Sequence, residues 1–244
     1  MAGKLTGKVA IITGASAGIG WASAIALAEE GAHLVITARR EDRLQQLVAD
    51  IKKAGGDATV VAGDAREEDT AKRTVEAALK VTGKIDILLN NAGMGIYKQL
   101  ADTTLDDYNT MMDVNMKSGF LFTRYVVPEM LKQKSGTILM LSSMAGVYGF
   151  PNEAVYCATK FAQVGFAQAL DKELRPHGIK VGAICPGGTK TEFAIGTGRT
   201  QEGVDASGML EPEDVAGAVL LACTQSANSR IIEIQMRTMN EALT

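Results

Sequence analysis

The sequence has few of the side chains that build metal sites and disulfide frameworks. It contains 3 cysteines among 244 residues, and no two of them form a Cys-x-x-Cys pair. An odd number of widely spaced cysteines predicts reduced thiols rather than disulfides or a thiolate zinc site. The 2 histidines, His33 and His177, have no histidine four residues away, so an ordinary surface or capping role is expected for both. We therefore predict no metal site, and a Ser-His-Asp triad loses support.

The sequence also lacks an excess of positive charge and any long hydrophobic run. Lys and Arg number 25 against 28 Asp and Glu, which gives a formal net charge of -3. This balance provides no general attraction for nucleic acid or for anionic membranes. No apolar run approaches the ~20 residues of a membrane span, and the run from Val9 to Ile12 is too short for a secretory signal. We expect a cytoplasmic protein with neither nucleic-acid nor membrane partners.

What the sequence does contain is a regular alternation of β-branched runs and helix-length segments. With 46% hydrophobic residues and no linker or internal repeat, residues 1–244 are expected to form one domain. Near-continuous apolar strands that alternate with helices predict a parallel sheet covered on both faces. The fold class is therefore α/β, with a doubly wound parallel sheet of about seven strands. The predicted strands are Val9–Thr13, Leu34–Thr37, Ala58–Ala62, Ile85–Leu89, Thr137–Leu141, Lys180–Ile184 and Ile231–Met236.

Two short patterns point to chemistry. Directly after the first strand, Gly14, Gly18 and Gly20 open a helix, an arrangement that lets backbone N–H groups approach a pyrophosphate. Further along, Tyr156 and Lys160 lie one helical turn apart, so a phenol and an ammonium share one helix face. Neither pattern is decisive alone. Together they indicate a dinucleotide site beside an acid-base pair.

These patterns, in their order along the chain, resemble those of the short-chain dehydrogenase/reductase family. The shared features are Thr-Gly-x-x-x-Gly-x-Gly, Asn-Asn-Ala-Gly at residues 90–93, Asn115, Ser143, Tyr-x-x-x-Lys, and Pro186-Gly187 with Thr191. The resemblance covers essentially the whole chain and implies a Rossmann-like domain with strand order 3-2-1-4-5-6-7. It also implies that residues 1–90 mainly bind a cofactor, whereas residues 91–244 mainly serve catalysis and substrate binding.

The resemblance places a nicotinamide dinucleotide at the carboxyl ends of the strands. In this family, Thr191 would fix the nicotinamide carboxamide, and Asp64 would contact the adenine amino group. A role for Asp64 as a cap of the following helix is an open alternative. The cofactor-binding residues that the resemblance implies are Gly14, Ser16, Gly18, Ile19, Gly20, Arg39, Arg40, Asp64, Ala65, Asn91, Ala92, Gly93, Tyr156, Lys160, Pro186, Gly187, Thr189 and Thr191.

The end of the second strand indicates which dinucleotide is bound. A carboxylate there usually holds the ribose diol of NAD, whereas a 2′-phosphate needs a cation. Ala38 stands at the position of that acid, and Arg39 and Arg40 follow it. A charge-assisted hydrogen bond contributes about 1.5–3 kcal/mol, or roughly ten- to over a hundredfold in preference. We therefore predict NADP(H), with Arg39 as the main phosphate partner and Ser16 as its helper. The alternative is that both arginines only begin a solvated helix face.

Hydride transfer to a carbonyl leaves a developing alkoxide that needs a proton donor. A tyrosine pKa near 10 lies about three units above neutrality, roughly 4 kcal/mol, and an ammonium ~4 Å away contributes about that much. Lys160 is therefore expected to lower the pKa of Tyr156. The resemblance adds Ser143 as a donor to the substrate oxygen, Lys160 as a partner of the nicotinamide ribose, and Asn115 as the holder of a water that joins Lys160 to solvent. The predicted catalytic residues are Ser143, Tyr156, Lys160 and Asn115.

The substrate wall is expected to be apolar. Residues 188–208 end in a stretch rich in glycine and polar residues, which predicts a mobile loop that serves as a substrate lid. Arg199 or Lys190 is a candidate clamp for a substrate carboxylate, although a cation on a lid is more often solvated. The predicted wall residues are Met94, Ile96, Met144, Tyr148, Phe150 and Phe193.

The leading hypothesis is an NADP(H)-dependent alcohol dehydrogenase or carbonyl reductase that acts on a small-to-medium substrate. The last strand lacks the Gly-Gly ending usual in ketoacyl reductases, and the ending looks more like that of the branch acting on 3-hydroxy acids. The alternatives are a 3-ketoacyl-carrier-type reductase, a non-catalytic NADP-sensing protein, and a nucleotide-sugar epimerase or dehydratase.

Association of the chain with further copies is also expected. The helix predicted over residues 152–177 carries an apolar surface wider than one buried stripe. Paired with the helix predicted over residues 105–131, it would form an intersubunit four-helix bundle, as in dimers and tetramers of the family. The apolar residues that make this surface wide are Phe161, Ala162, Val164, Phe166, Ala167 and Leu170.

Overall fold

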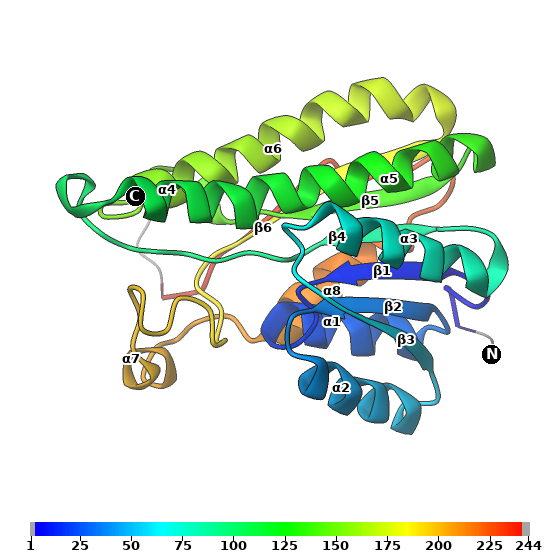
Figure 1. Ribbon diagram of the computed structural model, residues 1–244, viewed down its shortest axis with the longest axis horizontal. Coiled ribbons are helices and arrows are strands. Elements are labelled where there is room, and N and C mark those ends of the chain that lie inside the picture. The colour runs from blue at the N-terminus through cyan, green and yellow to red at the C-terminus, as the bar shows by residue number, and fades with distance from the viewer. Residues whose placement is uncertain (1–2, 241–244) are drawn as a thin grey trace.

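Seven parallel strands form the central sheet of the protein (Figure 1). The computed structural model describes residues 3–240, so residues 1–2 and 241–244 of the predicted domain lie outside the described residues. The strand order is β3-β2-β1-β4-β5-β6-β7, which confirms the predicted fold class and topology. The strands are β1 (Val9–Thr13), β2 (His33–Ala38), β3 (Asp57–Ala62), β4 (Ile87–Asn90), β5 (Gly136–Leu141), β6 (Ile179–Pro186) and β7 (Glu233–Met236).

Helices cover both faces of this sheet (Figure 1). One apolar core lies between the sheet and α3, α5 and α6, and a second lies between the sheet and α1, α2 and α8. No helix within residues 3–240 has the length and apolar content needed to cross a membrane. The helices are α1 (Gly18–Glu29), α2 (Glu41–Lys53), α3 (Glu68–Thr82), α4 (Leu105–Met112), α5 (Ser118–Gln133), α6 (Ala154–Leu174), α7 (Gln201–Asp205) and α8 (Pro212–Cys223).

The helix predicted over residues 105–131 is interrupted. A capping box between Thr104 and Asp107 begins α4, and a π-helical turn, Asp113–Lys117, joins α4 to α5. Such a turn inserts one extra residue into the helix and often marks a functional site. Here it contains Asn115, whose side chain faces the segment that follows β4.

The predicted lid contains a short helix that the composition of the segment did not indicate. Thr200 begins α7, and its Oγ1 accepts a hydrogen bond from the Gly203 N–H at 3.1 Å. The residues before α7 pack on the segment after β4, because Thr197 Oγ1 donates to the Gly95 carbonyl at 2.7 Å and the Tyr97 N–H donates to the Thr197 carbonyl at 2.8 Å. Residues 188–208 are therefore partly structured, and their closure over a substrate stays a prediction.

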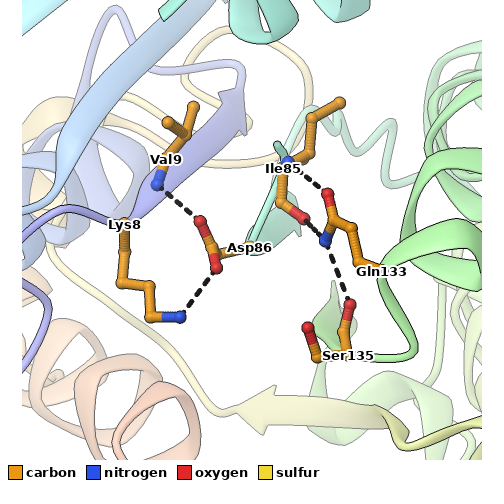
Figure 2. Close-up of polar contacts among 6 residues, drawn as sticks. All are labelled: Lys8, Val9, Ile85, Asp86, Gln133 and Ser135. Carbon is orange, nitrogen blue, oxygen red and sulfur yellow. Dashed lines mark hydrogen bonds and ion pairs between the residues drawn. The ribbon is translucent and has the colours of Figure 1, made fainter. Parts of the chain in front are cut away.

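At the amino ends of the strands, polar side chains bind neighbouring protein groups (Figure 2). The Asp86 carboxylate accepts from Lys8 Nζ at 2.8 Å and from the Val9 N–H at 3.0 Å. The Gln133 amide, at the end of α5, accepts from the Ile85 N–H and donates to the Ile85 carbonyl, both at 2.8 Å. These contacts join β1, β4 and α5 at the edge opposite the site described next.

Candidate active site

A cavity of about 660 Å³ opens where the strands end, and segments that follow β1 to β6 form its wall. Most of the predicted site residues lie in that wall, although four of them, Gly20, Asn115, Ile96 and Tyr148, do not. The predicted residues that line the cavity are Gly14, Ser16, Gly18, Ile19, Arg39, Arg40, Asp64, Ala65, Asn91, Ala92, Gly93, Met94, Ser143, Met144, Phe150, Tyr156, Lys160, Pro186, Gly187, Thr189, Thr191 and Phe193.

The glycine loop after β1 adopts a backbone that side chains rarely allow. Gly14 has a φ of +65°, and a Cβ there would lie 2.8 Å from the Ala92 Cα. Gly18 has a φ of +55°, and a Cβ there would lie 2.7 Å from the Thr191 Cγ2. Glycine at these positions permits the tight turn between β1 and α1, and the start of a helix beside a cavity favours a phosphate group.

Gly20 supports this loop without reaching the cavity. A Cβ at Gly20 would lie 2.7 Å from the Gly14 carbonyl oxygen. Asn91 closes the same region from the other side, because its amide donates to the carbonyls of Thr13 at 2.8 Å and Gly14 at 3.0 Å. The segment after β4 is thereby fixed to the end of β1.

The two arginines after β2 have different surroundings. Arg40 donates to Ser16 Oγ through Nη2 at 3.1 Å and forms an ion pair with Glu192 at 2.8 Å. Arg39 is exposed, and no carboxylate among residues 3–240 lies within 4.0 Å of its guanidinium nitrogens. The contact with Ser16 therefore belongs to Arg40, whereas Arg39 is the arginine without a competing ion pair.

Asp64, after β3, faces an arginine that the sequence analysis overlooked. Arg66 binds the Asp64 carboxylate through Nε and Nη2, with the shorter contact at 2.7 Å. Hydrogen bonding from Arg66 is the main cause of the lowered pKa of Asp64. Both side chains line the cavity, so Asp64 combines a loop-stabilising contact with a position in the wall.

Tyr156, on α6, lines the cavity and is 5% exposed. Its ring packs against the rings of Tyr97, at a centroid distance of 5.6 Å, and Phe193, at 5.8 Å. Burial raises the pKa of the Tyr156 hydroxyl well above its usual value, and a hydrogen bond with Ser143 offsets part of this rise. The rise is opposite in direction to the lowering by Lys160 that the sequence predicts, because burial is the main cause of the Tyr156 shift in this structure.

Lys160 lies one turn further along α6 and is 3% exposed. Its Nζ is 5.7 Å from the centroid of the Tyr156 ring and donates to the Leu141 carbonyl at 2.9 Å. Burial lowers the pKa of Lys160 to about 7. The sequence spacing correctly brings Tyr156 and Lys160 into one cavity, whereas the depth of burial sets the direction of both pKa shifts.

Asn115 is fully buried behind the cavity wall. Its side-chain amide accepts from the Met94 N–H at 2.7 Å, donates to the Met94 carbonyl at 2.9 Å and donates to Thr159 Oγ1 at 2.9 Å. These bonds hold the segment after β4 against α6. Asn115 therefore supports the site from behind the cavity wall.

Two of the residues predicted to form the substrate wall, Ile96 and Tyr148, do not line the cavity. Ile96 does not line the cavity and packs against the buried cluster that contains Tyr156. Tyr148 is 45% exposed, and its ring lies under the Arg237 guanidinium at 5.0 Å. Both residues lie in irregular segments, one after β4 and one after β5, so no regular periodicity predicts which side chains face the cavity.

Charged and aromatic residues that the wall prediction omitted surround Tyr156. Tyr97 has its pKa raised to about 12 by burial, and burial also raises the pKa of Glu153. Arg199 lines the cavity with its guanidinium 5.8 Å from the Tyr97 ring centroid and 5.9 Å from that of Phe193. Within residues 3–240, no carboxylate lies within 4.0 Å of the Arg199 nitrogens. Lys190, the other candidate clamp, is paired with Glu211 instead.

The family model described as short chain dehydrogenase matches residues 8–202, which include the glycine loop, Ser143, Tyr156 and Lys160. The chain belongs to the short chain dehydrogenase family. It is an oxidoreductase of that family, as the motif resemblance predicted. An uncharacterized oxidoreductase of Thermotoga maritima is 39% identical over 186 residues, which cover 76% of this chain and 73% of that protein.

Solved structures of the family share the whole fold. A metagenomic short-chain oxidoreductase in complex with NADP is 32% identical with a TM-score of 0.84, covering 98% of this chain and 100% of its own. An alcohol dehydrogenase from the archaeon Thermococcus sibiricus, complexed with 5-hydroxy-NADP, is 26% identical with a TM-score of 0.88. That match covers 97% of this chain and 99% of the archaeal chain.

Proposed function

We propose that the protein transfers a hydride between NADP(H) and an alcohol or carbonyl compound of small to medium size. One observation carries the proposal: Tyr156, Lys160 and Ser143 line the same cavity as the glycine loop and the arginines after β2. Two structural relatives were solved with NADP or a derivative of it, which supports the choice of cofactor.

The residues present fit such a cofactor. The glycine loop at the start of α1 suits a pyrophosphate, and the exposed Arg39 suits a 2′-phosphate. Thr191, beside the glycine loop, would hold the nicotinamide amide, and Lys160 would bind the neighbouring ribose. When bound, NADP(H) supplies or accepts the hydride.

The protein's own residues would handle the proton. In the reducing direction the Tyr156 hydroxyl donates a proton to the carbonyl oxygen, and in the oxidising direction the phenolate accepts it. Ser143, which lines the same cavity as Tyr156, would donate to the same oxygen and stabilise the developing negative charge. Tyr97 and Phe193 exclude water from the Tyr156 ring.

The proposal is tested by mixing the purified protein with NADPH or NADH and a panel of ketones, aldehydes and keto acids. We expect oxidation of NADPH by at least one carbonyl compound, at a kcat/KM at least about tenfold above that with NADH. Binding of NADPH, followed by quenching of Trp21 fluorescence, without turnover of any compound would favour the non-catalytic sensing alternative. Equal use of both cofactors would contradict the NADP preference.

The substrate class proposed is a 3-keto or 3-hydroxy acid. Arg199 provides a cation in the apolar wall next to Tyr156, where no carboxylate of residues 3–240 forms an ion pair with it. A guanidinium suits bidentate binding of a carboxylate. Replacing Arg199 by Gln should raise KM for a 3-keto acid about tenfold and leave KM for its methyl ester unchanged. Lys190→Gln is the matched control, and equal effects of the two changes on KM would exclude Arg199 as the clamp.

Self-association is proposed through the surface of α4, α5 and α6. Several apolar side chains of these helices are exposed in the single chain, including Leu105 at 74%, Phe120 at 44% and Phe161 at 47%. A second copy of the chain would cover this surface, as the sequence predicts. Light scattering should give the mass of a dimer or tetramer at micromolar concentration, and Phe161→Glu should lower that mass. A monomeric mass for the unchanged protein would exclude this surface as an interface.

A further inference from the structure

Gln163, a fully enclosed side chain on α6, connects two of the predicted catalytic residues. Lys160 Nζ donates to Gln163 Oε1 at 3.0 Å, and Gln163 Nε2 donates to the Asn115 backbone carbonyl at 2.6 Å. Gln163 is 1% exposed, and the family resemblance assigns no role to it. The side chain therefore fills the space between the lysine and the π-helical turn that carries Asn115.

The chemistry of the partners fixes the orientation of this amide. The Asn115 carbonyl only accepts hydrogen bonds, and a lysine ammonium only donates them. The opposite orientation would place the amide oxygen against a carbonyl oxygen and the NH2 group against an ammonium, which loses both hydrogen bonds. Gln163 therefore presents an acceptor to Lys160 and uses a donor to hold the π-helical turn.

This connection differs from the arrangement implied by the resemblance, in which a water on Asn115 joins Lys160 to solvent. We infer that Gln163 takes the place of this water and acts as a positioning residue, which holds the Lys160 ammonium beside Tyr156 through the Asn115 carbonyl. An amide with both hydrogen bonds satisfied keeps Lys160 in one rotamer. The inference rests on the proposed function only for its kinetic consequences.

The surroundings of Lys160 leave few other groups to fix its charge. Within the described part of the chain, the titratable groups that face it are Tyr156, one turn earlier on α6, and Cys185 on β6, whose thiol has its pKa raised by burial to about 11. The Leu141 carbonyl and Gln163 Oε1 are the neutral acceptors for the ammonium. Changing Gln163 is therefore expected to change the protonation of Lys160 directly.

Three replacements of Gln163 separate a positioning role from simple packing. Gln163→Met fills the same volume without an acceptor and leaves no room for water. Gln163→Ala opens a space in which a water can bridge Lys160 and the Asn115 carbonyl. Gln163→Glu keeps the shape and the acceptor for Lys160, replaces the donor to the Asn115 carbonyl by an oxygen, and adds a negative charge next to the lysine.

The inference predicts that kcat falls about tenfold or more in Gln163→Met and less in Gln163→Ala, because water restores the connection in the smaller variant. A packing role predicts the reverse order, since Ala leaves a cavity and Met does not. The reverse order, or unchanged kcat in both variants, would overturn the inference.

A second measurement needs neither cofactor nor turnover. NMR titration of protein labelled with ¹³C at the lysine Cε, with the Lys160 signal assigned by its loss in Lys160→Met, reports the pKa of this lysine. We expect a lower Lys160 pKa in Gln163→Met than in the unchanged protein, and a pKa raised by about one unit or more in Gln163→Glu. An unchanged Lys160 pKa in Gln163→Glu would overturn the inference even if the proposed function failed.

Gln133 provides the matched control (Figure 2). Its amide also bridges a donor and an acceptor, in this case the N–H and the carbonyl of Ile85, at the opposite edge of the sheet. Gln133→Met removes comparable hydrogen bonds far from Lys160. It should lower the free energy of unfolding and leave both kcat and the Lys160 titration unchanged, so that a general loss of stability is distinguished from a loss of positioning.

Discussion

The two edges of the parallel sheet use polar side chains in different ways. At the amino edge, Asp86 and Gln133 bind Lys8 and backbone groups of neighbouring elements (Figure 2). At the carboxyl edge, Tyr156 and Lys160 are buried in the wall of a cavity, with their pKa values shifted away from the ordinary range. The same strands therefore end in contacts that stabilise the fold on one side and in reactive groups on the other.

This difference indicates where stability and function can be changed separately. A polar group whose partners are all protein atoms contributes mainly to folding, whereas a buried ionisable group that faces a cavity costs stability. Substitutions at the amino edge should lower stability with little effect on turnover. Substitutions of the buried ionisable groups at the carboxyl edge should lower turnover strongly and leave stability unchanged or raise it.

Among the substitutions that test the difference between the two edges, Lys160→Met is expected to have the largest effect on turnover. Without the ammonium, kcat/KM should fall on the order of a hundredfold or more. The pKa of Lys160, about 7, lies below the ~10.4 of a free lysine, so burial of its charge costs most below pH ~7. Between pH ~7 and pH ~10 the lysine of the folded protein is neutral, whereas that of the unfolded protein still carries its proton, and the cost falls steadily. Above pH ~10 the lysine is neutral in both states, so the cost disappears.

Lys160→Met should therefore raise the free energy of unfolding more below pH ~7 than above pH ~10, as measured by urea denaturation at each pH. A Lys160→Met protein that is less stable than the unchanged protein at both pH values would show that this lysine contributes to folding. Lys160 would then stabilise the fold as the amino-edge residues do, which would contradict the proposed difference between the two edges.

Replacement of Ala38 by Asp should change the cofactor preference without altering the fold. A carboxylate at the end of β2 would repel a 2′-phosphate and accept hydrogen bonds from a ribose diol. We expect the ratio of kcat/KM for NADPH to that for NADH to fall by roughly ten- to a hundredfold. Arg39→Ala should lower the same ratio, and Arg43→Ala, on α2, serves as the control. No change in the ratio in Arg39→Ala would leave Arg40 as the phosphate partner.

Replacement of Asp86 by Ala should have the smallest effect on turnover. It removes the acceptor of the Val9 N–H and the partner of Lys8, and the loss should amount to about 1–3 kcal/mol of the free energy of unfolding. Most of this loss comes from the N–H bond, because Lys8 is half exposed and its ion pair contributes little. Denaturation and steady-state kinetics on the same preparation measure both quantities, and a large fall in kcat would contradict the separation of the edges.

Much of the fold could be predicted because local patterns and strand topology agree. The β-branched runs place seven strands within a few residues of their observed bounds, and the position of the glycines after β1 predicts the tight loop seen at Gly14 and Gly18. The spacing of Tyr156 and Lys160 also places both in one cavity, because a helix of known geometry carries them.

The parts that could not be predicted depend on contacts between distant segments. The ion pair of Arg40 with Glu192 joins residues 152 positions apart, and the link from Lys160 to Asn115 passes through Gln163, a residue type without a motif. The direction of the Tyr156 pKa shift depends on depth of burial, which a sequence does not give. The assigned roles of the site residues remain predictions for the measurements above.

A comparison of Tyr156→Phe with the unchanged protein tests the central claim most directly. The phenyl ring keeps the contacts with Tyr97 and Phe193 and removes only the hydroxyl. With NADPH and a carbonyl compound that the unchanged protein reduces, we predict a fall in kcat of about a hundredfold or more, with the dissociation constant for NADPH and the free energy of unfolding both little changed. Turnover by Tyr156→Phe at a rate close to that of the unchanged protein would contradict the account.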